Sequence, residues 1–306
     1  MDRDDALRSR RAAQDHRVRR RRLIAAGALG LLVVLAGVLI SRGDDAAAPT
    51  AVHQATPTST PHTIAKPEVK TIPIASMPGA HLAPGEPVAV LMYHVIGVRP
   101  PSAPNPTLWV TPQEFTAQVK GLRKAGYNAV TLRQVWDAWH HGGKLPRKPV
   151  VLSFDDGYAG QVRYALPTLA RRGWAGVLNL KLGNLKDMGG TRTVRRMTRA
   201  GWEIDSHTLT HPDLTTVPAQ QLRRELVVSR ARLRRYFHQA VSFFCYPSGR
   251  FDATVVAAVK DAGYKAATTV ELGWAKPGGD PYTLPRVRID AGMSPSAVLQ
   301  RLRDTR

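Results

Sequence analysis

Two adjacent carboxylates are the strongest chemical signal in this chain of 306 residues. Asp155 and Asp156 stand in the segment SFDDGY, directly after the apolar run PVVL at 149–152. Aspartate is also common at helix N-caps and in turns, so a purely structural role is the alternative interpretation. Two neighbouring acids at the end of a buried strand are hard to explain structurally, which favours a chemical role.

A second polar segment, SHTLTH, follows a predicted strand at 203–206 and carries His207 and His211. An isolated pair of histidines at this spacing is weak evidence, since surface histidines reach it by chance. Here Pro212 disfavours helical geometry at His211. We therefore expect both imidazoles on a loop at the end of a strand.

One aspartate and two histidines form the kind of three-ligand site that a catalytic divalent ion uses, with positions left open for water and substrate. Zn²⁺ fits this ligand set best. Co²⁺, Ni²⁺, Fe²⁺ and Mn²⁺ also accept nitrogen and carboxylate ligands, so ligand type alone leaves the metal open. The remaining aspartate is free to act as a base on metal-bound water, which gives each carboxylate a separate task.

These residues must be positioned by the alternating strands and helices that fill the globular part of the sequence. Thr111, Pro112 and Glu114 predict a helix start, as N-cap, first-turn proline and capping-box acid. The repeated βα pattern predicts a closed or nearly closed barrel, with a doubly wound open sheet as the alternative. In either fold the chemistry gathers where strands end. Strands are predicted at 88–93, 128–130, 150–154, 176–180, 203–206, 242–245, 264–268 and 283–289, and helices at 112–125, 132–140, 161–172, 194–200, 218–237, 254–262 and from 295.

SFDDGY and SHTLTH together resemble the first two signature motifs of the NodB-type polysaccharide deacetylases, carbohydrate esterase family 4. The resemblance covers roughly residues 86–290. It implies an α/β fold, a distorted (β/α) barrel of the NodB-homology type. It also implies that Asp155 is the catalytic base and that the metal ligands are Asp156, His207 and His211.

The segment FCYPSG at 244–249 resembles the third family motif and implies that the backbone N–H of Ser248 helps to hold the oxyanion. Many members carry an arginine that braces the base where this chain has Cys245. Arg286, in LPRV on a late strand, is our candidate to replace it. Cys245 is the only cysteine of the chain, which excludes an intrachain disulfide.

The family usually ends with a Leu-x-His element that supplies the general acid, and none occurs after residue 211. His94 closes the first strand in LMYH, and in a closed barrel this strand lies beside the C-terminal ones. This order resembles the permuted subgroup that includes the biofilm poly-N-acetylglucosamine deacetylases. We therefore expect His94 to be the general acid, with a satisfied core histidine as the alternative.

The N-terminal part predicts a membrane anchor. A basic cytoplasmic segment at 1–22 precedes an apolar run at 23–40, which as a helix covers roughly 27 Å, close to the thickness of a bilayer core. Arginines before this run and Asp44 and Asp45 after it place the N-terminus in the cytoplasm. A cleaved signal peptide is the alternative, because AAA follows at 46–48. A linker rich in Pro, Ala and Thr at 41–86 then leads to an extracytoplasmic deacetylase domain at 87–306.

These features together predict a metal-dependent enzyme that removes N-acetyl groups from an amino-sugar polysaccharide of the cell envelope or biofilm matrix. Poly-N-acetylglucosamine, peptidoglycan and chitin-like polymers remain open as substrates. An O-acetyl esterase and a catalytically inactive polysaccharide-binding protein are the alternatives. Glycoside hydrolysis fits poorly, since neighbouring strand residues point apart. The formal charge of +21 suits an anionic surface, and we expect the membrane and the polysaccharide, not nucleic acid, as partners.

Overall fold

The computed structural model describes residues 79–306. The predicted cytoplasmic segment, transmembrane helix and most of the linker lie outside the described residues. None of the helices within 79–306 combines the length and apolar character that a membrane span requires.

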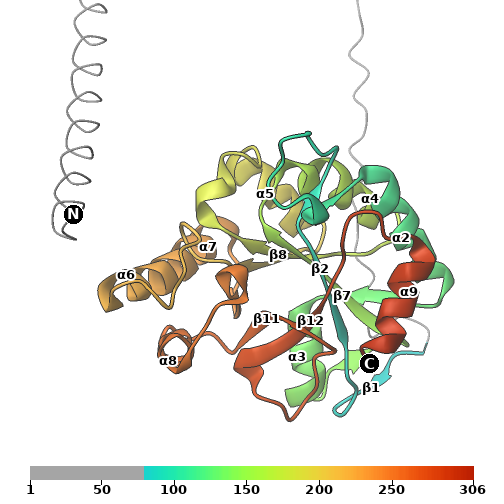
Figure 1. Ribbon diagram of the computed structural model, residues 1–306. Helices are drawn as coiled ribbons and strands as arrows, with labels where there is room; N and C mark the ends of the chain where they lie inside the picture. Colours follow the sequence, from blue (N-terminus) through green and yellow to red (C-terminus); the bar gives the residue numbers. More distant parts are fainter. Residues whose placement is uncertain (1–78) are drawn as a thin grey trace, which may run out of the picture. The chain divides into compact units, whose positions relative to one another are not determined.

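Seven parallel strands close into a barrel (Figure 1). Their order around the ring begins at β2, runs through β12, β11, β10, β9 and β8 to β7, and closes where β7 pairs with β2. A further strand, β5, pairs in parallel with the first half of β7. The structure therefore confirms the predicted barrel and not the alternative of a doubly wound open sheet. The bounds are β2 Ala89–Tyr93, β5 Asn128–Val130, β7 Pro149–Asp156, β8 Val177–Leu180, β9 Glu203–Ser206, β10 Phe243–Cys245, β11 Ala266–Leu272 and β12 Leu284–Arg288.

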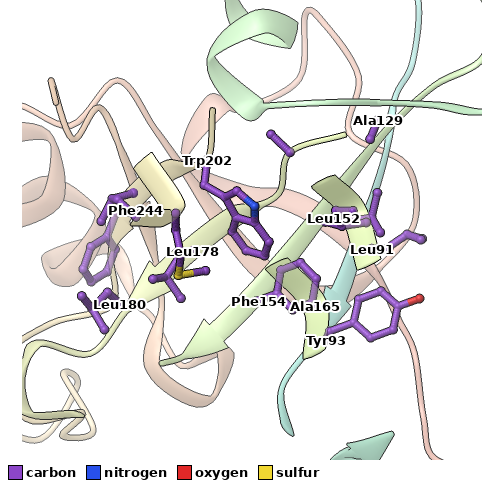
Figure 2. Close-up of a cluster of buried hydrophobic side chains, with 14 of the residues drawn as sticks. Leu91, Tyr93, Ala129, Leu152, Phe154, Ala165, Leu178, Leu180, Trp202 and Phe244 are labelled. Carbon is purple, nitrogen blue, oxygen red and sulfur yellow. The ribbon is translucent and has the colours of Figure 1, made fainter. Parts of the chain in front are cut away.

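The strands of the barrel appear as apolar runs in the sequence because both faces of each strand are buried. All eight residues of β7 and all five of β2 are buried. The outward face packs against the surrounding helices through a cluster in which Tyr93, Phe154 and Trp202 are in ring contact (Figure 2). The inward face of β7 carries Val151, Ser153 and Asp155 in alternation.

Helices connect the strands and cover the outside of the barrel (Figure 1). Helix α3 is an exception, because it packs against inward residues such as Val90, Val151 and Phe243 and so fills the end of the barrel remote from Asp155. The predicted capping box is confirmed, with Thr111 and Glu114 bonded to each other's backbone N–H. The helices are α2 Pro112–Lys124, α3 Leu132–His140, α4 Leu166–Ala170, α5 Gly190–Arg199, α6 Ala219–Arg223, α7 Ser229–Phe237, α8 Ala253–Asp261 and α9 Pro295–Asp304.

Two of the predicted helices contain a π-helical stretch that the sequence does not announce. Residues Gln161–Ala165 precede α4, and Arg224–Val228 join α6 to α7. Their i→i+5 geometry depends on packing and not on helix propensity, so periodicity alone predicts a plain helix over each region. The second stretch contains Glu225, whose side chain accepts hydrogen bonds from the backbone of Leu209 and Thr210.

The structure corrects several strand bounds. The sequence predicts a strand that ends at Phe154, whereas β7 continues through Asp155 and Asp156 because both residues pair with β8. Strand β11 extends to Leu272 through a bulge, and the region predicted as strand at 283 begins as a turn before β12. Four two-residue strands, too short for any periodic signal, also occur: β1 His81–Leu82 with β6 Lys144–Leu145, and β3 Val95–Ile96 with β4 Trp109–Val110.

Candidate active site

The predicted metal ligands meet at the carboxyl end of the barrel. Asp156 ends β7, and His207 and His211 lie on the loop after β9. Asp156 Oδ1 lies 3.6 Å from His207 Nε2 and 3.6 Å from His211 Nε2. One donor atom from each residue falls within 4.8 Å of the others, close enough to share a single ion. The structure thus brings the three residues together, while their role as ligands stays a prediction.

The hydrogen bonding of His207 fits metal binding. Its Nδ1 lies 2.7 Å from the carbonyl oxygen of Cys245, so Nδ1 carries the proton. In the neutral ring, the lone pair of the other nitrogen, Nε2, faces Asp156. Burial opposes protonation of His207, but Cys245, Asp155 and Asp156 raise its pKa to about 9, so an ion that binds at neutral pH displaces the Nε2 proton. Burial and the neighbouring His207 lower the pKa of His211, which favours the neutral imidazole that a metal needs. The donor set therefore suits Zn²⁺ or a similar divalent ion.

Backbone strain accompanies this geometry. Asp156, Thr208 and His211 adopt positive φ angles of 68°, 69° and 66°, a region that residues other than glycine rarely occupy. Such conformations cost about 1–3 kcal/mol each and gather at functional sites, where surrounding contacts maintain them. Contacts from the segment after β8 support this backbone, since the N–H of Lys181 donates to the Asp156 carbonyl and the N–H of Leu182 to the Thr208 carbonyl.

Asp155 lies next to the triad but is held by a different partner. Both of its oxygens accept hydrogen bonds from Arg286, at 2.8 Å each, and Oδ1 also accepts one from Asn179 Nδ2 at 2.8 Å. Burial of Asp155 opposes its ionisation, but the charge and hydrogen bonds of Arg286 outweigh burial and hold its pKa well below the usual value. The structure therefore keeps Asp155 as a carboxylate, which is the form that can accept a proton.

Arg286 is completely enclosed, with a relative exposure of 1%. Its Nε donates to the carbonyl of Thr269, which lies in the part of β11 where the register with β12 shifts. The remaining N–H groups find acceptors at Ser153 Oγ, both Asp155 oxygens and Cys245 Sγ. The guanidinium thus lies against Cys245, the position at which many family members carry the arginine that this chain lacks. That Arg286 serves the reaction by bracing the base stays a prediction.

His94 directly follows β2 and also lies near Asp155. Its Nε2 is 3.8 Å from Asp155 Oδ2, and its side chain is 12% exposed. The buried Nδ1 has no hydrogen-bond partner among residues 79–306, which does not fit a satisfied core histidine. Burial lowers the pKa of His94, although Asp155 and Asp156 act in the opposite sense. An imidazole open to the site on one side is suited to move a proton.

Ser248 lies in the 3₁₀ turn Pro247–Gly249 directly after β10, at the same barrel edge as His207. Its φ of 53° is again left-handed. An ion pair between Arg250 and Asp213 joins the segment after Ser248 to the segment after His211. This contact places the predicted oxyanion donor on a loop tied to the histidine loop, and its role stays a prediction.

Sequence reasoning does not identify three residues that support the site. Asn179 reaches Asp155 from the neighbouring strand β8, and Gln161 Nε2 donates to the backbone carbonyls of His94 and Asp155, at 2.8 Å each. Glu225 bonds the histidine loop. The asparagine inside the apolar run VLNL is a signal that could have been read. The other two depend on the π-helical stretches and leave no mark in the sequence.

Comparisons with known proteins show which family the chain resembles. Residues 142–267 match the family model for polysaccharide deacetylase. A Bacillus subtilis relative named "Putative polysaccharide deacetylase YxkH" is 31% identical over 211 residues, which cover 68% of this chain and 73% of that protein. The Escherichia coli poly-beta-1,6-N-acetyl-D-glucosamine N-deacetylase is 44% identical over 61 residues, 20% of this chain and 9% of that protein.

The structure is similar to that of the Streptococcus pyogenes deacetylase PplD in complex with acetate. The TM-score is 0.65 at 28% identity, and the match covers 71% of this chain and 99% of PplD. Three findings lead to the same result. They are the family match, the relative aligned over most of its length, and the barrel that carries Asp155, Asp156, His207 and His211 at one edge. The chain belongs to the polysaccharide deacetylases, a family of hydrolytic enzymes.

Proposed function

We propose that the chain is a metal-dependent deacetylase that hydrolyses the N-acetyl groups of an amino-sugar polysaccharide. One observation supports this most directly: an ionised carboxylate, Asp155, lies beside a separate set of three potential metal ligands. Deacetylation by water needs both a base and a means to activate the carbonyl, and this site offers residues for each.

Asp156, His207 and His211 would hold the ion, with Zn²⁺ favoured and Co²⁺, Ni²⁺, Fe²⁺ or Mn²⁺ as alternatives. When bound, a divalent ion lowers the pKa of water and polarises a carbonyl. Asp155 accepts the proton of the attacking water, because Arg286 keeps its carboxylate ionised. The backbone N–H of Ser248 stabilises the oxyanion that develops on the acetyl group.

His94 then donates a proton to the departing sugar amine, which would otherwise be a poor leaving group. Its position supports this role, since Nε2 faces the site and lies 3.8 Å from Asp155. Burial lowers its pKa, so the protonated form becomes scarcer as the pH rises above the acidic range. The reaction releases acetate and leaves a free amino sugar in the polymer.

Poly-N-acetylglucosamine is the substrate that we favour. The proposed general acid, His94, directly follows β2, the N-terminal strand of the barrel, which fits the permuted order of that subgroup, and one relative is named as an N-deacetylase of this polymer. Peptidoglycan and chitin-like polymers carry the same acetamide group and are the alternatives. An acetyl ester on a cell-wall polysaccharide is chemically easier to hydrolyse and defines a second candidate activity.

Acetate release from a panel of these polymers, with polymer length followed in parallel, tests the proposal. We expect acetate from one N-acetylated polymer without chain cleavage, and none from Asp155→Asn protein. Chain cleavage would indicate a glycosidase. Acetate from O-acetylated polymers alone would indicate an esterase, and no acetate from any polymer would favour a binding protein.

We also propose that the domain acts outside the cytoplasmic membrane, tethered by the apolar segment at 23–40 and the linker at 41–86. The asymmetry of charge around the apolar segment supports this orientation. Secretion after signal cleavage is the alternative.

A further inference from the structure

The loop that carries both histidines has a backbone that needs external support. Between His207 and His211, Thr208 adopts a φ of 69°, and His211 itself one of 66°. Neither residue is a glycine, so each conformation costs free energy that nearby contacts must offset. Small relaxations of this loop would change the distance between the two imidazoles.

Glu225 provides the only side chain from outside this loop that hydrogen-bonds its backbone N–H groups within residues 79–306. Its Oε2 accepts from the N–H groups of Leu209 and Thr210, at 2.7 and 3.0 Å. Its Oε1 accepts from the hydroxyl of Thr210 at 2.7 Å. One carboxylate therefore holds the two residues that lie midway between the histidines.

The other contacts hold different groups of the loop. The carbonyls of Thr208 and Leu209 accept from the backbone N–H groups of Leu182 and Gly183, at 3.0 and 2.8 Å. The N–H of His211 donates to Thr208 Oγ1 at 2.9 Å. Removal of Glu225 would therefore leave the N–H groups of Leu209 and Thr210 without their acceptor, while the contacts on the other face of the loop remain.

The burial and the hydrogen-bond partners of Glu225 fit a role in holding the histidine loop. It is 3% exposed and lies in the π-helical stretch Arg224–Val228. No lysine, arginine or histidine within the described part of the chain lies at ion-pair distance from it. A buried carboxylate is costly unless hydrogen bonds or charges compensate it, and here the loop supplies all three hydrogen bonds. Short π-helical stretches are frequent at functional sites, and this one contains the residue whose side chain reaches the histidine loop.

We propose that Glu225 is a positioning residue that fixes the loop between His207 and His211 in the conformation required for metal binding. It acts through the backbone of Leu209 and Thr210 and touches neither imidazole. The inference rests on the proposed metal site. Outer partners of this kind commonly change metal affinity by about 10- to 100-fold.

The test compares metal affinity in the purified full-length protein, solubilised in detergent. Co²⁺ binding is followed by its visible absorption, and Zn²⁺ affinity by competition with a chromophoric chelator. Glu225→Leu removes the acceptor and should weaken both affinities by about 10- to 100-fold. Glu225→Asp keeps the charge but shortens the side chain by one methylene, and should also weaken binding and alter the Co²⁺ spectrum.

Glu225→Gln is the rescue variant, because its amide oxygen can accept from both backbone N–H groups while the Thr210 hydroxyl turns to accept from the amide nitrogen. It should bind metal within a few-fold of wild type. Leu226→Ala is the matched control: Leu226 is fully buried in the same helical stretch, so its loss should lower Tm without altering metal affinity or the spectrum.

Wild-type affinity in the folded Leu and Asp variants would overturn the positioning role and leave the metal site intact. An equal loss of affinity in Leu226→Ala would also overturn it, because general destabilisation would then be the cause. If Glu225→Leu does not fold, the comparison of Glu225→Asp with Glu225→Gln decides. Absence of metal binding by the wild-type protein would contradict the metal site itself, and this inference with it.

Discussion

Arg286 on β12 and Asp155 on β7 form a buried two-point ion pair, in which each Asp155 oxygen accepts a hydrogen bond of 2.8 Å. The two strands are not neighbours in the ring, because β2 lies between them. The contact therefore crosses the interior of the barrel. It also fixes the ionisation of the predicted base, since Arg286 stabilises only the charged form of Asp155.

Arg286→Ala should move the acidic limb of the kcat/KM profile to higher pH. Arg286 holds the pKa of Asp155 low, so its loss raises that pKa, and a larger fraction of the base becomes protonated and inactive as the pH falls. The rate at neutral pH should drop by up to about 10²–10⁴-fold, the usual contribution of a positioned base. Rates measured from pH 4 to pH 9 check this.

Removal of one partner from a buried ion pair also costs about 3–5 kcal/mol of stability, so a control is needed. Arg230 is partly buried and bonds the carbonyls of Val241 and Ala262 on the outside of the barrel. Arg230→Ala should lower Tm without a shift of the acidic limb. An unshifted limb in folded Arg286→Ala protein would mean that Arg286 has only a structural role.

The sequence predicts the barrel well because its strands are buried on both faces and appear as apolar runs separated by helices. It also brings Arg286 to attention, as a basic residue inside the predicted strand 283–289. It does not predict the register shift between β11 and β12 at which the Thr269 carbonyl accepts from Arg286, since such a shift arises from pairing between strands. The partners of a site residue depend on register around the ring, which periodicity along one segment does not contain.

Because such contacts depend on strand register and packing, the sequence alone does not identify Asn179 and Glu225 as residues of the site. Asn179 stands opposite Asp155 only because β7 extends past Phe154 and pairs with β8 in that register. Glu225 reaches the histidine loop from a π-helical stretch that the sequence presents as ordinary helix. The motif residues themselves were identifiable, because polar residues at the ends of apolar strands leave a local signal.

His94→Ala should retain fold and metal but lose rate on N-acetyl substrates by about 10²–10⁴-fold. A general acid must be protonated, so activity falls as the pH rises through the pKa of His94. Because burial lowers that pKa, the alkaline limb of wild-type kcat/KM should lie at lower pH than for an ordinary histidine, and it should vanish in the variant.

An activated acetyl ester provides the internal comparison for His94, because its leaving group departs with little help from a proton. Hydrolysis of this ester should be much less affected than that of the amide. Equal slowing of both substrates, or mere destabilisation of the protein, would favour a core histidine and place the acid elsewhere.

Protease added to intact cells should release the domain at 87–306 from the outside, because the arginines before the apolar segment at 23–40 predict a cytoplasmic N-terminus. A cytosolic marker protein, unaffected until the cells are permeabilised, serves as the control. A domain that is protected in intact cells, or that fractionates with the cytosol, would contradict the anchor. A domain found free in the medium would favour signal cleavage.

Acetate release measured together with bound metal is the most direct test of the central claim, that Asp156, His207 and His211 hold the ion and Asp155 acts as the base. Chelation of the wild-type protein should abolish acetate release, and added Zn²⁺ or Co²⁺ should restore it. His211→Ala should lose metal and activity together, whereas Asp155→Asn should retain metal and lose turnover. Full acetate release by exhaustively chelated protein, confirmed free of metal, would contradict the account.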